Sequence, residues 1–492
     1  MEVPEAFNLA AWLLAGAEAR GDGGRVAVRS GGVDLTYEEV ADRAARAAAV
    51  LRERGVRPEE RVLLALPDGP DLLAAVLGAL LAGAVVVPAP DRPGLADHAH
   101  LVAHSRARLA VAAREVAAAC GRDTVPAADL AAAVDAAEPW AGAEATSRDD
   151  PAFWLYTSGT TGRPKAAVHL HGDMAHCWSG FGSGVLGLGP GDRTFSVARM
   201  TSPSGIGNSI VFPLAAGAST VLGTDVAAVL RDDGPTVLFA RPANYRALLE
   251  DEAAVEAPAL RLAVSSGDTL PADLHRRFRE RFGVEILEGT GSTEAFHVYL
   301  CNRPGRVRPG SSGEVVPGYE ARLVDDDGGD VADGEVGQLL VRGGSVCSHY
   351  ARDRDRSKDA ILGHWLVTGD RYRRDGDGVF WYVGRANDTW FQDGAEVAPF
   401  PIEEALGTHP AVREAGVAGV DVGPGRRRPV AWVVVREGGP GEAGEALAAE
   451  LTAHVAAALG EAMAPAAVRF VDALPRTATG KVQRFRLRES WS

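Results

Sequence analysis

The chain has 492 residues, of which 46% are hydrophobic, and its formal net charge at pH 7 is −15. This length exceeds one ordinary domain, so we expect a globular protein of two or three domains with large cores. The acidic balance argues against a nucleic-acid partner, because no basic stripe that could follow a phosphate backbone is present.

Cysteine usage and the N-terminal residues bear on the compartment. The four cysteines are widely scattered and form no C-x-x-C pair, which argues against a disulfide framework and against a metal cluster. The N-terminus carries Glu2 and Glu5, whereas an export signal begins with basic residues. We therefore expect a reducing, cytoplasmic compartment.

Residues 72–90 form a charge-free segment close to the length of a membrane span. Glycines and prolines interrupt it, and a buried helix, a turn and a strand over 84–87 explain it better. We therefore expect no membrane partner.

Helical stretches alternate with short β-branched runs along most of the chain, which is the pattern of α/β layers. In chain order the sequence predicts a turn at 31–34, a helix over 36–54, a strand over 61–66, and βα units over 238–249 and 260–282. Short strands separated by Asp/Gly turns then predict a β-rich subdomain over about 305–384. A module of about a hundred residues follows, with a helix near 401–406, strands near 412–420 and 429–435, and a helix over 442–459.

Residues 156–165 read Y-T-S-G-T-T-G-R-P-K and are suited to holding polyphosphate. The loop follows an apolar run, as a phosphate loop follows a strand, but it lacks the Walker A spacing. Its glycines let backbone N–H groups turn toward an anion, while its hydroxyls donate and its cations supply countercharge. The sequence therefore predicts an ATP site, although a flexible surface loop has a similar composition. The candidate nucleotide-binding residues in this loop are Thr157, Ser158, Gly159, Thr160, Thr161, Gly162 and Lys165.

This loop is similar to the phosphate loop of the adenylate-forming (ANL) superfamily, which includes acyl-CoA synthetases, adenylation domains of peptide synthetases and firefly-type luciferases. The resemblance implies an α/β fold with a large N-terminal domain of layered α/β subdomains and a β-rich subdomain, followed by a small mobile α+β C-terminal domain. It places the N-terminal domain at 1–384, a hinge at 385–388 and the C-terminal domain at 389–492.

The segment 288–294, E-G-T-G-S-T-E, resembles the part of that family that holds adenine and the magnesium-bound phosphates. The resemblance implies that Thr293 bonds a phosphate and that Glu294 provides the hard oxygen ligand that Mg²⁺ prefers. An isolated Ser-Thr-Glu could instead cap a helix. The resemblance adds as nucleotide-binding residues Glu288, Gly289 and Thr290 here, and Ser266, Gly267 and Asp268 in a turn that resembles the border of the adenine.

Three charged residues further along match other stations of the family. Asp370 resembles the carboxylate that accepts both ribose hydroxyls, and Arg385 resembles an arginine that also reaches the ribose. Either could alone be a surface ion pair. Lys481 matches the catalytic lysine of adenylation, which with Mg²⁺ would offset the repulsion between the attacking carboxylate and ATP. The implied product is an acyl-adenylate.

Residues 291–305 resemble the benzoate–CoA ligase branch, which loads aromatic acids onto coenzyme A. His297 matches a pocket histidine, although a histidine on a helix is as often a satisfied core residue. Small residues stand where that branch has aromatic side chains, which predicts room for a bulky aryl or polycyclic acid of secondary metabolism. A side chain from elsewhere could fill the space. The candidate acyl-pocket residues are Ser202, Pro203, Ser204, Gly205, Gly291 and His297.

The second half-reaction, with coenzyme A, meets two departures from the family. Asn387 stands at the hinge where Asp or Lys is usual, and Gln392 and Asp393 replace a small turn before Gly394 in the loop that lines the thiol tunnel. These changes could obstruct the thiol or shift the balance between domain orientations. Two hypotheses stay open: a complete ligase that makes acyl-CoA, and an adenylating enzyme that hands acyl-AMP to a carrier protein or separate transferase.

Two further patterns and one other class of function carry less weight. The G-x-G-x-x-G at 182–187 leaves no room for the helix that a dinucleotide site requires. His169 and His171 lack a metal-ligand pattern, so we expect packing or polar contacts from them. An inactive nucleotide-binding regulator is disfavoured because Lys481, Glu294 and Asp370 are all present.

Overall fold

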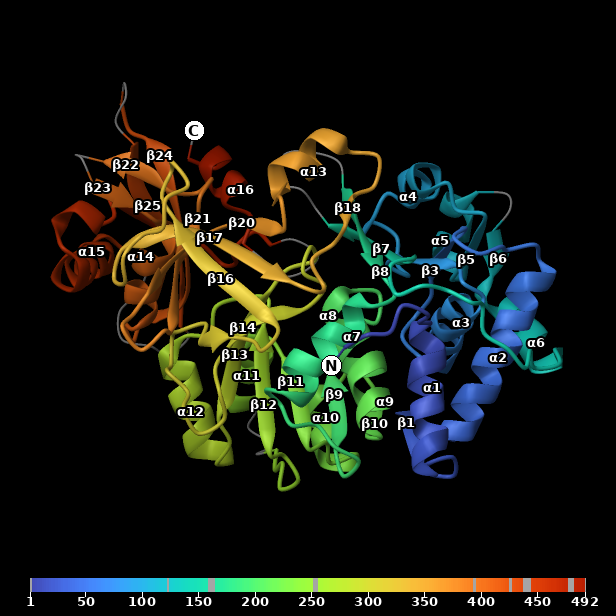
Figure 1. Ribbon diagram of the computed structural model, residues 1–492. Coiled ribbons are helices and arrows are strands. Elements are labelled where there is room, and N and C mark those ends of the chain that lie inside the picture. Colours follow the sequence, from blue (N-terminus) through green and yellow to red (C-terminus); the bar gives the residue numbers. More distant parts are fainter. Residues whose placement is uncertain are drawn as a thin grey trace.

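The computed structural model describes residues 2–121, 124–157, 164–250, 255–392, 395–423, 427–436, 444–476 and 482–491. Two large sheets with flanking helices are followed by a smaller antiparallel sheet and a compact C-terminal unit (Figure 1). The predicted α/β layers, the β-rich part and the small α+β C-terminal part are all present.

The largest sheet has nine strands within the described residues, and its central strands are parallel. The antiparallel strands lie at its two ends, where β2 pairs with β1 and β14 pairs with β13. In spatial order the strands are β15 (Glu314–Val315), β14 (Val298–Cys301), β13 (Ile286–Gly291), β12 (Leu262–Ser266), β11 (Val237–Ala240), β9 (Arg193–Ser196), β10 (Ser219–Leu222), β1 (Val26–Ser30) and β2 (Val33–Thr36).

The second large sheet has a parallel part and an antiparallel edge. Its short outer strand, which pairs with β8, comes from a segment far along the chain. In order the described strands are β18 (His349–Tyr350), β8 (Lys165–Leu170), β7 (Pro151–Thr157), β4 (Val85–Pro88), β3 (Arg61–Ala65), β5 (Leu109–Ala112) and β6 (Thr124–Pro126).

The β-rich part is an antiparallel sheet. Its strands are β16 (Tyr319–Val324), β17 (Val336–Gly343), β20 (Trp365–Arg374) and β19 (Ile361–Leu362), with β21 (Phe380–Arg385) beside β20. The C-terminal unit contains the hairpin β22 (Trp390–Gln392) and β23 (Ala395–Val397), and the sheet β24 (Val412–Asp421), β25 (Arg427–Val435) and β26 (Ala467–Phe470).

Local sequence explains why α2 begins after Thr36. The Thr36 hydroxyl accepts from the Glu39 N–H, and the Glu39 carboxylate accepts from the Thr36 N–H, which is a capping box. The α-helices are α1 (Leu9–Arg20), α2 (Tyr37–Glu53), α3 (Pro70–Leu81), α4 (His98–Ser105), α5 (Arg114–Cys120), α6 (Ala127–Ala136), α7 (Asp173–Cys177), α8 (Pro203–Ile206), α9 (Phe212–Ala216), α10 (Val226–Asp232), α11 (Pro242–Glu250), α12 (Ala272–Phe282), α13 (Arg354–Ala360), α14 (Pro399–Gly407), α15 (Glu445–Leu459) and α16 (Arg484–Glu489). The described residues also form π-helices η1 (Trp178–Ser183) and η2 (Gly207–Val211), and the 3₁₀ turn η3 (Glu461–Met463).

The predicted turn at 31–34 is wrong at its end. Val33 and Asp34 belong to β2, so the turn is limited to the two glycines between β1 and β2. His297 lies on the turn before β14 rather than on a helix, because β13 and β14 pair directly and leave no room for one. The 182–187 pattern falls at the end of η1 and follows no strand.

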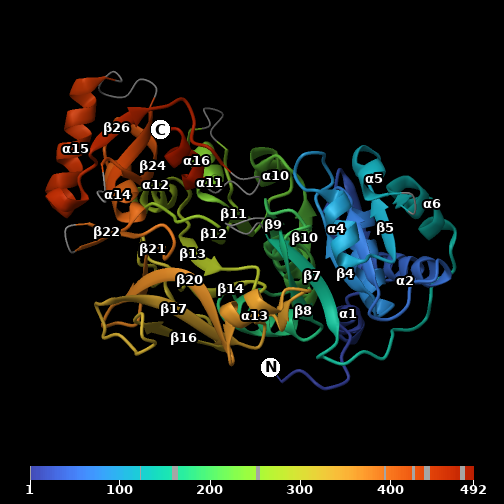
Figure 2. The same ribbon diagram turned by 90° about the horizontal axis from the view of Figure 1, so that it is seen from above.

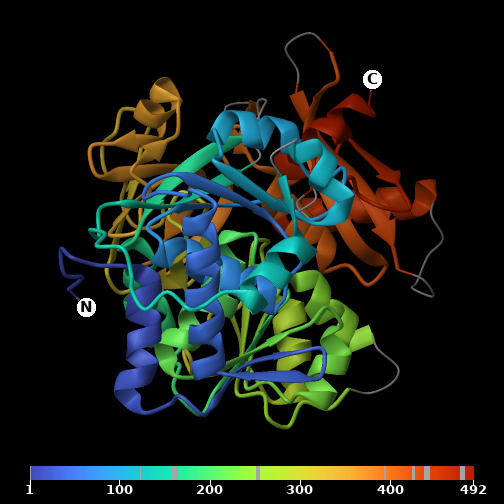
Figure 3. The same ribbon diagram turned by 90° about the vertical axis from the view of Figure 1, so that its right-hand side faces the viewer.

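The molecule is elongated. The C-terminal unit and α6 lie at opposite ends in Figure 2, with the three larger sheets between them. Figure 3 shows the two termini well apart on the surface. Among the described residues, none of the helices combines the length and apolar character needed to cross a bilayer. All four cysteines are buried and free.

Candidate active site

The candidate adenine residues lie at the carboxyl ends of neighbouring parallel strands. Ser266 is the last residue of β12 and pairs with Gly289 of β13, one residue after Glu288 in the chain. Ligands of open α/β sheets bind at such strand ends. Gly267 follows with a φ of 94°, a left-handed conformation that glycine adopts without a Cβ penalty. The exposed Asp268 comes next, as expected for a turn that borders a ligand.

The phosphate side is formed by the hairpin of β7 and β8. Thr157 ends β7 and lies opposite Lys165, the first residue of β8. The ammonium group of Lys165 is 3.0 Å from a carboxylate oxygen of Glu294. The loop residues Ser158, Gly159, Thr160, Thr161 and Gly162 lie outside the described residues, so their predicted roles stay predictions.

Tyr350 joins Lys165 and Glu294 in a compact cluster. Its hydroxyl donates to Glu294 at 2.7 Å, and the Lys165 ammonium lies 4.1 Å from the centre of its ring. Burial opposes ionisation of Glu294, but Lys165 and the bond from Tyr350 outweigh it and lower the pKa of the carboxyl. Glu294 is therefore an ionised oxygen ligand held beside a cation.

A carboxylate of this kind fits a magnesium site that is completed by phosphates. Mg²⁺ is usually bound by one or two carboxylates together with substrate phosphates and water. Within the described ranges no three His, Cys, Asp or Glu residues cluster as metal ligands, so the protein alone does not form a cage. Glu294 is the residue present that fits the ion.

The ribose candidates face each other across one antiparallel pair. Asp370 of β20 lies directly opposite Arg385 of β21, and the guanidinium Nε is 2.8 Å from Asp370 Oδ1. The carboxylate is nearly buried, whereas the arginine is 44% exposed. Burial lowers and Asp370 raises the pKa of Arg385, with the net shift upward. The pair thus presents a fixed, charged acceptor at the sheet edge.

The strand that carries Asp370 is tied to β13 by hydroxyl contacts. Tyr372 donates to the hydroxyl of Thr290 at 3.2 Å, and Thr290 donates to Ser312 at 2.9 Å. The two halves of the candidate nucleotide site are therefore held together by Thr290, whose neighbours take up its hydroxyl.

Glu288 occupies a different environment from the one its predicted role implies. Its side chain is buried and contacts the backbone of Leu270, while Oε2 has no hydrogen-bond partner among the described groups. Burial raises the pKa of this carboxyl well above its ordinary range, and Glu404 of α14 adds to the effect. The carboxyl of Glu288 is therefore a buried, largely protonated group beneath the site.

The acyl candidates meet at His297, which packs between two phenylalanines. Its ring centroid is 5.2 Å from that of Phe181 in η1 and 4.7 Å from that of Phe212 in α9. Nε2 lies 3.2 Å from the Asn208 amide oxygen, and burial lowers the pKa of His297 to about 3. Both adjoining segments include π-helical turns, which recur at functional sites. A neutral imidazole thus forms part of an aromatic wall.

The small-residue segment lies next to this wall. Ser202 caps α8: its hydroxyl accepts from the Gly205 N–H at 3.2 Å and donates to the Arg199 carbonyl at 2.8 Å. Pro203 and Ser204 are half-buried at the start of the same helix. A Cβ on Gly291 would lie 2.4 Å from the carbonyl oxygen of His297, so only glycine fits there. Sequence position and space thus bring these acyl candidates together.

The hinge and tunnel candidates are partly described. Asn387 is exposed in a turn, whereas Gln392 is buried and donates from its amide to the Ala462 carbonyl at 2.8 Å. The Gln392 side chain is therefore held within the C-terminal unit rather than exposed to an incoming thiol. Asp393 and Gly394 lie outside the described residues.

Lys481 also lies outside the described residues, but the chain on either side of it is placed. Arg476 and Val482 form a β-bridge, which brings together the two ends of the segment that contains Lys481. Arg476 Nη1 is 4.0 Å from Asp268 Oδ2 beside the adenine candidates. Arg476 also pairs with Glu414 at 2.8 Å, and Glu414 contacts Arg246 of α11 at 3.4 Å. The base of the lysine loop therefore lies at the nucleotide candidates.

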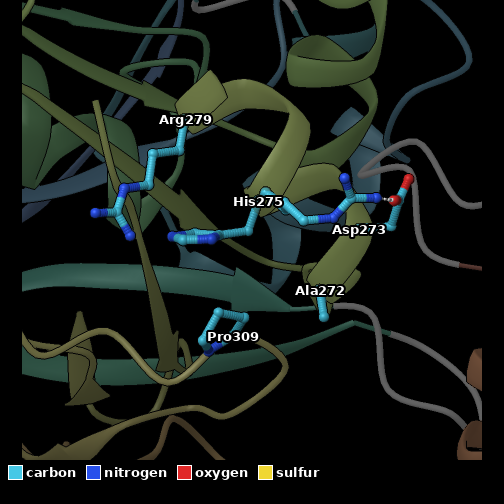
Figure 4. A pocket seen from close by; sticks show the side chains of 6 residues that line it. Ala272, Asp273, His275, Arg279 and Pro309 are labelled. Carbon is cyan, nitrogen blue, oxygen red and sulfur yellow. Dashed lines mark hydrogen bonds and ion pairs between the residues drawn. The ribbon is translucent and has the colours of Figure 1, made fainter. Parts of the chain in front are cut away.

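A cavity of about 410 Å³ lies away from all of these groups, between α12 and the loop at Pro309. Figure 4 shows His275 extending from α12 toward Pro309, with Arg279 beside it. None of the candidate nucleotide or acyl residues lines it, so the size of a hollow is a poor guide to the site here.

Several site residues were missed by sequence reasoning. Tyr350, Tyr372, Asn208, Phe181 and Phe212 stand in no recognised motif, and their contacts are made by residues far apart in the chain. Asn208 alone had a signal, since it ends the G-x-G-N pattern that was used only to align the residues before it.

Comparison with known proteins follows the same division of the chain. The AMP-binding enzyme family matches residues 16–351, and the AMP-binding enzyme C-terminal domain matches residues 401–481. A benzoate–CoA ligase of Thauera aromatica is 36% identical over 100% of this chain and 97% of its own. The crystal structure of a benzoate CoA ligase from Burkholderia xenovorans LB400 has a TM-score of 0.91 at 38% identity, covering 98% of this chain and 100% of the other. A p-hydroxybenzoic acid–AMP ligase of Mycobacterium marinum is 35% identical over 92% of this chain and 65% of its own.

Proposed function

The chain belongs to the AMP-binding enzyme family, and on that premise we propose that it activates an aryl carboxylic acid with ATP and Mg²⁺ and transfers the acyl group to coenzyme A. It is an AMP-forming acid–CoA ligase of the adenylate-forming superfamily. The identity of the acid, the use of Mg²⁺ and the role of each site residue are part of the proposal.

One observation carries the proposal: a single turn links the two substrates' candidate sites. Residues 291–297 leave β13 with Glu294 against Lys165 and enter β14 with His297 against Phe181 and Phe212. A polar, charged side and an apolar aromatic side thus adjoin on one short segment. Such an arrangement suits a reaction between a triphosphate and an aryl acid.

The described charges favour the adenylation step. Lys165 and Lys481 would face the phosphates, while Asp370 and Arg385 would hold the ribose. In that step an oxygen of the substrate carboxylate bonds to the α-phosphorus, the bond to the β-phosphate oxygen breaks, and pyrophosphate leaves. Bound Mg²⁺ would neutralise phosphate charge, with Glu294 as its protein ligand.

Thioester formation would follow on the same acyl group. The thiol sulfur of coenzyme A bonds to the acyl carbon, its proton is released, and AMP leaves with the carboxyl oxygen. We propose that residues 389–492 move as a domain about 385–388 between the two steps. The burial of the Gln392 side chain supports this step, because it removes one of the two predicted obstructions from the thiol's path.

The size of the acid is the finer part of the proposal. The relatives named above are ligases of benzoate or p-hydroxybenzoic acid, and the aromatic wall at His297 suits a flat ring. The small residues 202–204 leave room beyond one ring. We propose an aryl acid that carries more bulk than benzoate, of the kind that secondary metabolism produces.

The test measures pyrophosphate release and acyl-CoA formation in parallel, with acids from benzoate to polycyclic carboxylates. Ser204→Tyr should shift the preference toward benzoate, because the added ring occupies the extra space, while Ser204→Ala should leave the preference unchanged. Benzoate as the best substrate of the wild-type protein would refute the larger pocket.

A second candidate is an enzyme that stops at acyl-AMP. The Mycobacterium marinum relative is named as an AMP ligase, and Asn387 departs from the family's hinge residue. Omitting coenzyme A from the same assay separates the two. Acid-dependent acyl-AMP that never becomes thioester would favour this candidate and imply a separate transferase or carrier protein.

A further inference from the structure

The turn between β13 and β14 is held in a strained backbone conformation. Phe296 has a φ of 62°, a left-handed value that is rare for a bulky side chain. Its N–H donates to the Thr293 carbonyl at 3.1 Å, and the His297 N–H donates to the Ala295 carbonyl at 2.7 Å. A backbone of this kind persists only where the surroundings fix it, and such places concentrate at functional sites.

His169 of β8 contacts this turn at two points. Its Nε2 lies 2.7 Å from the Thr293 carbonyl oxygen, and its ring centroid is 4.5 Å from that of Phe296. Phe153 packs edge-on against the other side of Phe296, with a centroid distance of 5.3 Å. The imidazole is fully buried. His169 therefore contacts both the first and the last residue of the Thr293–Phe296 turn.

Asp173 of α7 fixes the orientation of that imidazole. Asp173 Oδ2 is 2.7 Å from His169 Nδ1 and also accepts from the Leu170 N–H at 3.1 Å. Since the Thr293 carbonyl can only accept, Nε2 must carry a hydrogen, and a second hydrogen lies between Nδ1 and Asp173. A ring bonded at both nitrogens in a buried site cannot turn without breaking a bond.

We propose that His169 and Asp173 are positioning residues that hold the Thr293–Phe296 turn, so that Glu294 faces the phosphates of ATP while His297 faces the acyl group. The inference rests on the proposed function for the identity of the two ligands. It assigns a role in the reaction to a histidine whose sequence pattern indicated only packing. The structure supplies the reason, because the Thr293 carbonyl that His169 bonds directly precedes Glu294.

The adjoining histidine provides a matched control. His171 is also fully buried at the junction of β8 and α7, but its Nδ1 accepts from the Leu9 N–H at 3.1 Å, away from the turn. His171→Leu should lower thermal stability and leave the kcat of the folded protein unchanged. His169→Leu should lower the kcat of acid-dependent pyrophosphate release about 100-fold, because misplacement by about 1 Å can have that effect.

A second readout does not require turnover. ATP affinity is measured by calorimetry with and without Mg²⁺, and the gain that Mg²⁺ provides should be lost in His169→Leu and retained in His171→Leu. His169→Gln should restore most of the kcat and the Mg²⁺ gain, since its amide can still donate to Thr293. If His169→Leu does not fold, Asp173→Asn decides the question, with a smaller loss expected in the same two quantities.

The outcomes separate the two proposals. If wild-type protein activates no acid but the Mg²⁺ gain is lost only in the His169 and Asp173 variants, acid activation fails and the positioning role stands. If the protein activates an acid while these variants keep wild-type kcat and Mg²⁺ gain and lose only thermal stability, the positioning role is overturned. Equal losses in His169→Leu and His171→Leu would also overturn it.

Discussion

Asp370→Asn tests whether the fixed carboxylate of β20 holds the ribose. The substitution keeps the size of the side chain but removes the charge that pairs with Arg385 at 2.8 Å. A hydrogen bond to a charged acceptor contributes about 1.5–3 kcal/mol. If one such bond from a ribose hydroxyl is lost, kcat/KM for ATP should fall roughly 10- to 150-fold, since every 1.4 kcal/mol is about tenfold.

The assay compares ATP with 2′,3′-dideoxy-ATP in both proteins. Wild-type enzyme should prefer ATP by at least the factor given above, whereas the variant should use the two nucleotides with similar kcat/KM. Asp326→Asn is the matched control, because Asp326 pairs with Arg371 at 3.8 Å in the same part of the fold but is 87% exposed. An equal loss with both nucleotides, with the preference for ATP intact, would refute the assignment and leave Asp370 as the partner of Arg385 alone.

Three other substitutions test the interior of the site. Glu288→Gln should raise the melting temperature at neutral pH: the native carboxyl has a raised pKa, so wild-type stability is greatest below the ordinary glutamate value of about 4.5 and falls as pH rises, by up to about 1.4 kcal/mol per pH unit. Identical pH–stability curves would contradict this. Gly207→Ala should lower kcat/KM for the acid, since the new Cβ would lie 2.6 Å from the ring of His297 and overpacking costs about 1–3 kcal/mol; steady-state kinetics showing unchanged kcat/KM would count against the pocket. Gln392→Gly should destabilise the C-terminal unit without accelerating thioester formation from acyl-AMP, because the amide bond to Ala462 is lost, and a faster rate in single-turnover experiments would show that Gln392 does obstruct the thiol.

The elements that could be predicted are those whose cause is local. The helix over 36–54 was confirmed as α2 because Thr36 and Glu39 cap it through neighbouring backbone groups. The strand over 61–66 was confirmed as β3, whose continuous apolar run is buried between layers. The predicted βα unit at 260–282 likewise corresponds to β12 and α12. The family fold followed from short motifs, since a phosphate loop and its partners occur in a fixed order.

What could not be predicted depends on partners distant in sequence. Tyr350 contacts Glu294 and Lys165 only because β18 joins the sheet beside β8. The motif gave Glu288 a place in the nucleotide segment, but its own side chain is directed to a buried space near Leu270. His169 had no pattern around it, and only the turn at Phe296 gives it a partner. A motif identifies which segment forms a site, whereas packing decides which atoms face it.

The two π-helical turns beside His297 have a consequence for how this pocket could change over evolution. A π turn holds one residue more than the helix it interrupts, so deleting a residue within Trp178–Ser183 or Gly207–Val211 could restore a regular α-helix. Each such deletion would rotate the following side chains by about 100° around the helix axis. Phe212, directly after the second turn, would then leave the aromatic wall and another residue type would face the acid. Substrate preference in this fold can therefore shift by insertion or deletion of one residue, while the strands that carry the nucleotide groups keep their register.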